Sequence, residues 1–135
     1  MGKFTELETD IYSIFGSGLW QNENIKTVPA NFIVPDPGTE YIRINVVPSG
    51  TGINRNSVSG ILLIDIFTSA GEGTRASTLI ADKLDDFLQE ETISTVAGKN
   101  TQFKFSTLTF DGLDPVSKNL HKSSYTIPFN YFGVL

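Results

Sequence analysis

The chain has 135 residues, 39% of them hydrophobic, and these values predict one soluble globular domain over residues 1–135. It contains no cysteine, which excludes disulfides, thiolate metal sites and a cysteine nucleophile. A net charge of −5 does not supply the basic surface that nucleic-acid binding needs, and no secretory signal or apolar run of about 20 residues is visible. We therefore expect a protein assembled in a cytoplasm and not held in a membrane.

The first predicted element is an amphipathic helix near the N-terminus. Its apolar residues recur at spacings of three and four: Phe4, Leu7, Ile11, Ile14 and Phe15. Thr5 and Glu8 fit a capping box, and Gly16 and Gly18 end the pattern. The pattern predicts a helix that packs its apolar stripe on a sheet.

A strand and a hairpin tip follow. The segment 41–47 alternates between apolar and polar residues, which predicts a strand with one buried face. Residues 48–59 are rich in glycine and asparagine and contain Ile53, Asn54, Arg55 and Asn56, so they predict a long, mobile hairpin tip. Loops of this length often carry function, but many are only flexible.

The segment Gly60–Phe67 is apolar on both faces except at Asp65, which predicts a strand inside the sheet. Asp65 has two interpretations. It is either a polar partner for a neighbouring strand, with Arg43 as one candidate, or a catalytic carboxylate. No second acid or histidine can be placed beside it from the sequence.

A second helix is predicted from a glycine turn at residue 71 to about Glu91. Its buried stripe consists of Ala76, Leu79, Ile80, Leu84, Phe87 and Leu88. Asp82, Asp86 and Glu90 line another face at four-residue spacing, where like charges repel. This acidic face is either simply solvated or turned toward a partner or a channel.

Two further strands are predicted at 102–110 and 124–134. In the last one, Pro128 removes a donor from the ladder and predicts an edge strand or a bulge. Phe129, Tyr131 and Phe132 either complete the core or bury against a neighbouring subunit. The order of elements predicts an α+β fold, a largely antiparallel sheet with two helices packed against it.

One short motif has the context of a nucleotide-binding turn. Gly71–Ala76 matches G-x-G-x-x-A, follows a strand and opens a helix. Three features argue against nucleotide binding. Glu72 places a negative charge where phosphate would bind, and residues 68–70 separate the strand from the turn. The helix is also not followed by an apolar strand that ends in an acidic residue, which would bind the ribose. The alternative is a structural turn in which Thr74 caps the helix.

His121 is the only histidine. A metal site there would need carboxylate ligands, and Asp111 and Asp114 do not have a recognised ligand spacing. A Ser-His-Asp triad stays open, although no G-x-S-x-G elbow supports it. An exposed loop histidine is the simpler interpretation.

Several stretches together carry a family resemblance. They are Trp20 with Asn22, Pro29 to Phe32 with Pro35, Tyr41 to Arg43 with Val47 and Pro48, Gly60 to Phe67, Gly71 to Gly73, and Ile80 to Leu84 with Phe87. In order and spacing they resemble the tail-terminator-like proteins of long-tailed bacteriophages, the lambda gpU-like group. The resemblance covers residues 4–90, and the later strands only in general character.

The resemblance implies a structural protein of the virion with an α+β fold, without catalysis, metal or cofactor. Such proteins form six-subunit rings at the head-proximal end of the tail. The ring caps the tail tube, stops addition of tube subunits and joins the head-completion or connector protein, while DNA passes through it without specific binding.

On that basis we expect Ile53, Asn54, Arg55, Asn56, Phe129, Tyr131 and Phe132 to contact a neighbouring subunit or the tail tube. We expect Asp82, Asp86 and Glu90 to face the channel. Two alternatives stay open: a neck protein of the head–tail connector, and a small nucleotide-binding protein using the Gly71–Ala76 turn.

Overall fold

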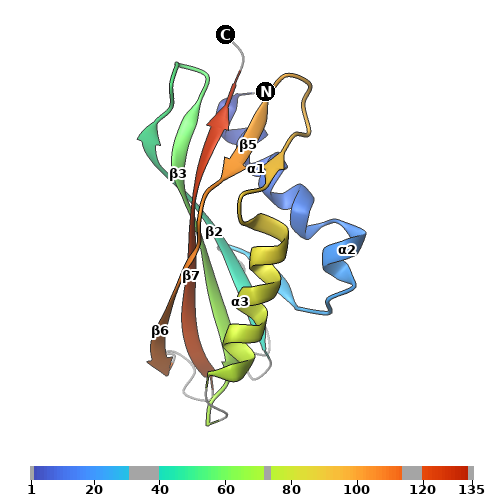
Figure 1. The fold of residues 1–135 in the computed structure, drawn as a ribbon, viewed down its shortest axis with the longest axis vertical. Helices are drawn as coiled ribbons and strands as arrows, with labels where there is room; N and C mark the ends of the chain where they lie inside the picture. Colours follow the sequence, from blue (N-terminus) through green and yellow to red (C-terminus); the bar gives the residue numbers. More distant parts are fainter. Residues whose placement is uncertain (1, 31–39, 72–73, 114–119, 134–135) are drawn as a thin grey trace.

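The chain folds as an α+β protein, as predicted. A computed structural model describes residues 2–30, 40–71, 74–113 and 120–133. In it a long, twisted sheet carries the helices on one face (Figure 1). The helices are α1 (Lys3–Phe15), α2 (Gly18–Gln21) and α3 (Arg75–Leu88), so one short helix joins the two that were predicted.

Within the described residues the sheet has seven strands. They are β1 (Thr27–Pro29), β2 (Tyr41–Thr51), β3 (Val58–Ser69), β4 (Thr92–Ile93), β5 (Asn100–Phe103), β6 (Thr107–Leu113) and β7 (Leu120–Phe132). Their order is β1-β2-β3-β7-β5-β4, and β6 also pairs with β7. The β1–β2 pair is parallel, and the other pairs are antiparallel.

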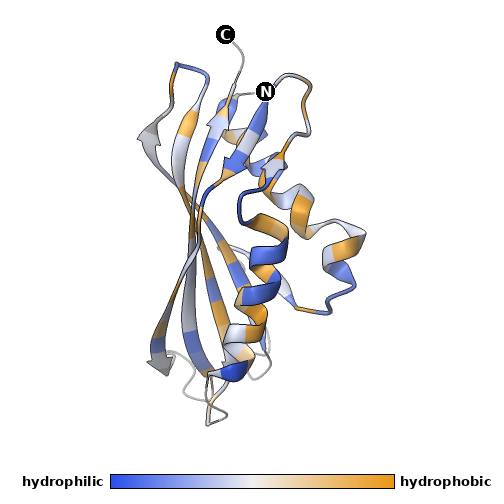
Figure 2. Cartoon of the chain, viewed as in Figure 1, coloured by the Kyte–Doolittle hydropathy of each residue, from blue (hydrophilic) through white to orange (hydrophobic). Residues whose placement is uncertain are grey.

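Alternation along the strands places the core between the sheet and the helices. Ile44 on β2, Ile64 on β3 and Tyr125 on β7 stand side by side in the register and are almost wholly buried. The helices cover them with their own apolar stripes, which include Ile11 and Leu84 (Figure 2). Burial of these side chains is the main favourable contribution to folding.

Three boundaries differ from prediction because tertiary pairing extends or stops an element. β2 continues to Thr51 and β3 begins at Val58, so the hairpin tip is shorter than residues 48–59. α3 ends at Leu88 instead of about Glu91, because Gln89 is extended and Glu90 adopts a positive φ of 60°. The predicted helix N-cap at Thr74 is correct in position, but its side chain makes no capping hydrogen bond.

The predicted strand over 102–110 is two strands, and this explains Pro128. β5 and β6 both pair with β7, and the strand is interrupted between them at residues 104–106. β7 lies between β3 and these two strands, so the prediction of an edge position for Pro128 is wrong. The carbonyl of Pro128 accepts from Lys104 N at 2.9 Å. The backbone nitrogen of Pro128 faces the same side as its carbonyl, toward the interruption between β5 and β6. A ladder donor is least needed there, so the missing N–H of proline is tolerated.

No helix in the described ranges is long and apolar enough to cross a membrane.

Candidate functional site

The β2–β3 hairpin tip gathers the predicted contact residues at one end of the sheet. Ile53, Asn54, Arg55 and Asn56 form the turn between the two strands. The start of α1 and the end of β7 lie at the same end of the molecule (Figure 1). Three segments that are distant in sequence therefore build one surface.

The turn is held by side-chain hydrogen bonds. Asn54 Oδ1 accepts from Asn56 N at 2.9 Å and from Ser57 Oγ at 3.0 Å. Ser57 Oγ in turn accepts from Gly133 N at 3.1 Å, which ties the tip to the end of β7. A Cβ on Gly133 would lie 2.1 Å from Asn56 O, so only glycine permits this approach.

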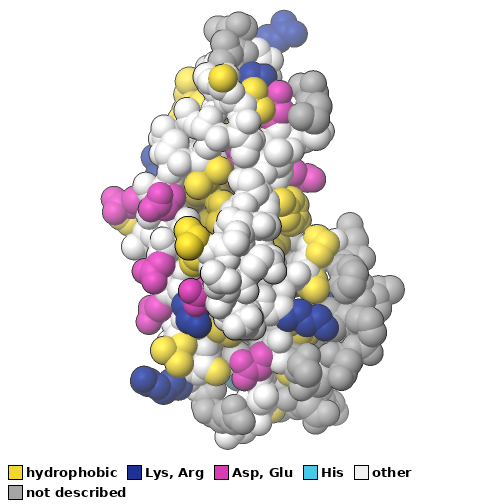
Figure 3. Space-filling model, turned by 90° about the vertical axis from the view of Figure 1, so that its right-hand side faces the viewer, with side chains coloured by type: hydrophobic (Ala, Val, Ile, Leu, Met, Phe, Trp, Pro, Cys, Tyr) yellow, Lys and Arg dark blue, Asp and Glu magenta, His cyan; other side chains and the backbone are white. Residues whose placement is uncertain are grey.

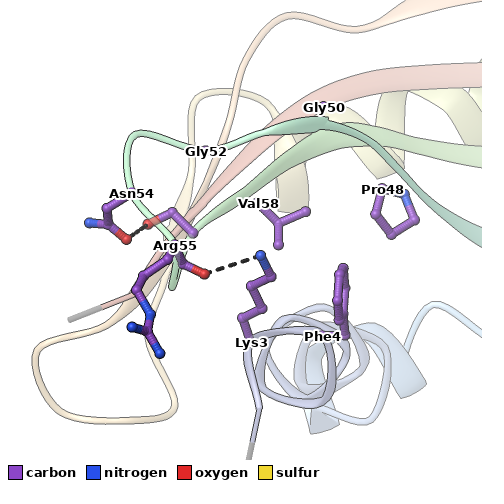
Figure 4. Close-up of a pocket in the computed structure, with 9 residues that line it drawn as sticks. Lys3, Phe4, Pro48, Gly50, Gly52, Asn54, Arg55 and Val58 are labelled. Carbon is purple, nitrogen blue, oxygen red and sulfur yellow. Dashed lines mark hydrogen bonds between the residues drawn. The ribbon is translucent and has the colours of Figure 1, made fainter. Parts of the chain in front are cut away.

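A groove of about 420 Å³ separates the tip from α1. Figure 4 shows Lys3 and Phe4 rising from α1 toward Pro48 and Val58. Lys3 Nζ donates to the carbonyl oxygen of Arg55 at 3.1 Å and so bridges the two walls. The lining thus combines apolar side chains with two cations.

Two apolar side chains at this end stay in water. Ile53 is 78% exposed and Phe4 is 55% exposed. Periodicity assigned Phe4 to the buried stripe of the first helix, and that assignment is wrong. Phe4 lies in the first turn of α1, where the helix reaches the rim of the groove. The sequence signal for the groove, a lysine and a phenylalanine at a helix start, is too general to have identified it.

The structure corrects part of the predicted contact surface at the C-terminal strand. Phe129 and Tyr131 are each 1% exposed and belong to the core, so they are not available to a partner in this fold. They are buried because β7 is central and both side chains point toward the helices. Phe132 is half-buried.

Tyr131 and Glu6 form a buried polar contact beneath this end of the molecule. The Tyr131 hydroxyl donates to Glu6 Oε2 at 2.6 Å, and Lys99 Nζ lies 3.0 Å from both carboxylate oxygens. The hydrogen bond from Tyr131, followed by that from Lys99, lowers the pKa of Glu6. These contacts fasten α1, and with it one wall of the groove, to the sheet.

The predicted acidic face of the second helix is exposed. Asp82 and Asp86 project from the solvent side of α3, and Glu90 is exposed just beyond its end. Figure 3 shows acidic side chains gathered along one side of the molecule. Asp85 is different: its Oδ1 accepts from Ser106 Oγ at 2.5 Å and from Tyr125 at 2.6 Å.

The candidate nucleotide-binding turn lacks its usual setting. Gly71 has φ +88°, while Glu72 and Gly73 lie outside the described residues. β3 runs to Ser69, so the expected separation between strand and turn is small. Such a motif belongs to a parallel β-α-β unit, whereas the strand after α3 is β4, which pairs only with β5 among the described strands.

The surroundings of Asp65 match the first of its two interpretations, a polar partner for neighbouring strands. Its Oδ2 accepts from Asn45 at 3.3 Å, its Oδ1 lies 3.8 Å from Lys122 Nζ, and Arg43 stands directly opposite it. His121 lies in β7, not in an exposed loop, with its ring 6.4 Å from that of Phe110. Among the described residues, no three acidic or histidine side chains are grouped to hold a metal.

Comparison with known proteins adds the fold alone. No protein-family model and no curated protein matches the chain. One solved structure superposes with a TM-score of 0.63 over 97% of this chain and 94% of its own, at 14% sequence identity. Its name describes no activity, ligand or partner, and a likeness at this identity shows a shared fold only.

Proposed function

We propose that this chain is a structural virion protein that forms a ring at the head-proximal end of a long phage tail. The ring stops addition of tail-tube subunits and presents the surface that the head joins. The proposal rests on the resemblance over residues 4–90 and on the α+β fold. The structural feature that favours an assembly role is the end surface formed by the hairpin tip and α1.

That surface has the character of a protein contact site. Ile53 is more than three-quarters exposed and sits beside the groove that contains Phe4. Arg55 adds a cation at the same place, and arginine and aromatic residues are enriched where proteins meet. The turn is fixed by Asn54 and by Gly133, which lowers the entropy lost on binding.

The test is deletion of the gene in the phage or prophage that encodes it. If the ring stops tube growth, the deletion produces overlong tails that carry no heads, seen by electron microscopy of lysates. Expression of the wild-type chain in trans restores tail length. Tails of normal length in the deletion strain would contradict the proposal.

A neck protein of the head–tail connector is the second candidate, because it has the same general architecture. The same deletion separates the two roles. Loss of a neck protein leaves tails of normal length that fail to join heads. A position of the gene beside a portal gene instead of a tail-tube gene also favours the neck role.

A further inference from the structure

We infer that the groove at the hairpin tip receives the exposed face of α3 from a second copy of this chain. This inference deepens the proposed function, because it names the two surfaces that meet between neighbouring subunits. It reassigns Asp82 and Asp86 from a channel wall to a subunit contact.

The first surface is basic and apolar. Among the described residues that line the groove, Lys3 and Arg55 are the charged ones and none carries a carboxylate. Ile53 and Phe4 supply exposed apolar area at its rim. Glu8 lies one helical turn further along α1, outside the lining residues. We call this surface, formed by Lys3, Phe4, Ile53 and Arg55, the tip surface.

The second surface is mainly acidic and apolar, and Arg75 lies exposed on the same side of the helix one turn before Leu79. Asp82 and Asp86 project from α3 one turn apart, and Leu79, 48% exposed, lies on the same side of the helix. Phe105, 65% exposed, follows Lys104, whose carbonyl accepts from Glu90 N at the end of α3. We call the surface formed by Leu79, Asp82, Asp86 and Phe105 the α3 surface.

The α3 surface is unfavourable in an isolated chain. Asp82 and Asp86 repel each other at four-residue spacing, and Asp86 lies near the helix C-terminus, where the dipole disfavours anions. The last turn of α3 contains no basic residue to offset this. A cationic surface on a partner removes the penalty, and the tip surface carries cations without acids.

The two surfaces complement each other and differ from each other, so the contact is head-to-tail. A pair of copies keeps one free tip surface and one free α3 surface, and repetition closes a ring when the rotation permits. Apolar contact between Ile53 or Phe4 and Phe105 or Leu79 provides the area excluded from water. The ion pairs mainly select the partner and the register.

The experiment uses two full-length variants with exposed substitutions. The tip variant carries Ile53→Ser and Arg55→Ser, and the face variant carries Asp82→Lys and Asp86→Lys. Sedimentation velocity over a range of concentrations measures assembly. Lys26→Glu, which reverses another exposed cation, is the matched control and assembles like wild type.

Each variant alone is expected to weaken self-association about tenfold or more. The tip variant loses apolar area and a cation, and the face variant sets two lysines against Lys3 and Arg55. Mixing the two variants joins the intact tip surface of one to the intact α3 surface of the other. The altered tip surface and the altered α3 surface that stay free do not attract each other, so the mixture forms one-to-one dimers that grow no further. A single chain with Arg55→Glu and Asp86→Arg restores longer assemblies by exchanging the charges.

Three results would overturn the inference. They are a wild-type chain that stays monomeric at all concentrations, a tip variant that assembles like wild type, and a mixture that shows no dimer. Assembly of the face variant with loss in the tip variant would mean that tip surfaces pair with one another. Deletion phage with normal tails, together with the expected dimers, would contradict the proposed function and leave this contact intact.

Discussion

Glu6 in α1 accepts a hydrogen bond from the hydroxyl of Tyr131 in β7, 125 positions later in the chain. The two residues join the first helix to the last strand. Because Lys3 and Phe4 lie on the same helix one turn earlier, this buried contact also positions the wall of the groove. Stability and the proposed assembly surface are thus linked through one carboxylate.

Replacing Glu6 with glutamine is expected to destabilise the protein at neutral pH. The charged form of Glu6 is stabilised by Tyr131 and Lys99, which lower its pKa below the ordinary value of 4.5. Its contribution is therefore complete above the unfolded pKa and is lost as pH falls through the lowered folded pKa. Urea unfolding should show a lower midpoint for Glu6→Gln at pH 7 and a shrinking difference from wild type below about pH 4. An equal difference at all pH values would contradict this account.

Alkaline pH is expected to act through two tyrosines. Burial, and then the hydrogen bond to Asp85, raises the pKa of Tyr125 above its ordinary value of 10, and burial with Glu6 does the same for Tyr131. The unfolded chain releases these protons first, so stability falls as pH rises above about 10, by up to roughly 1.4 kcal/mol per pH unit for each group.

Urea titrations between pH 9 and 11 test this slope. A chain with Tyr125→Phe and Tyr131→Phe starts less stable, because Asp85 and Glu6 each lose a donor, but it should show a much shallower pH dependence. A slope as steep as that of wild type would place the titrating groups elsewhere.

Gly60 is expected to tolerate no side chain. A Cβ there would lie 2.3 Å from the carbonyl oxygen of Val47 and 3.0 Å from the ring of Phe129. Gly60→Ala should therefore lower the unfolding free energy by about 1–3 kcal/mol, since β2 or the Phe129 ring must move. Gly18→Ala is the control, because a Cβ at that helix start meets nothing within 4 Å. It should be neutral or stabilise by up to about 1 kcal/mol.

Trp20 is expected to report unfolding and to contribute strongly to stability. It is the only tryptophan, 1% exposed, and its ring meets those of Phe15 and Phe87 edge-on at 5.2 Å. Its fluorescence should shift to the red on unfolding as the indole enters water. Trp20→Ala should cost about 3–5 kcal/mol, measured by circular dichroism in urea. Trp20→Phe should cost less, because it retains part of the ring contacts although it loses ring volume and the hydrogen bond to Thr27.

The candidate site divides into a part that was readable from sequence and a part that was not. Glycine and asparagine at 50–56 between two apolar strands predicted the hairpin, and the four tip residues do lie at its end. Lys3 and Phe4 were not associated with them, because nothing in the sequence brings residue 4 beside residue 48. Packing of α1 on the sheet created the groove.

Two neighbouring acidic residues have different environments, and only the folded structure shows this difference. Asp85 and Asp86 are adjacent, yet Asp85 accepts hydrogen bonds from Ser106 and Tyr125 while Asp86 faces solvent. Helical periodicity predicted that they point in different directions. It did not predict that a serine from the β5–β6 connection and a tyrosine from β7 lie beside one of them.

The sequence by itself determined the α+β class, both long helices and the central strand, because periods of 3.6 and 2 residues reflect local geometry. The tertiary structure alone decided that Phe129 and Tyr131 are core residues, that Pro128 sits in a central strand, and that Phe4 is exposed. The exposure of Phe4 depends on where α1 packs on the sheet, and the other two features depend on which strand lies beside which. That choice is made by long-range pairing, to which alternation along a single strand is blind.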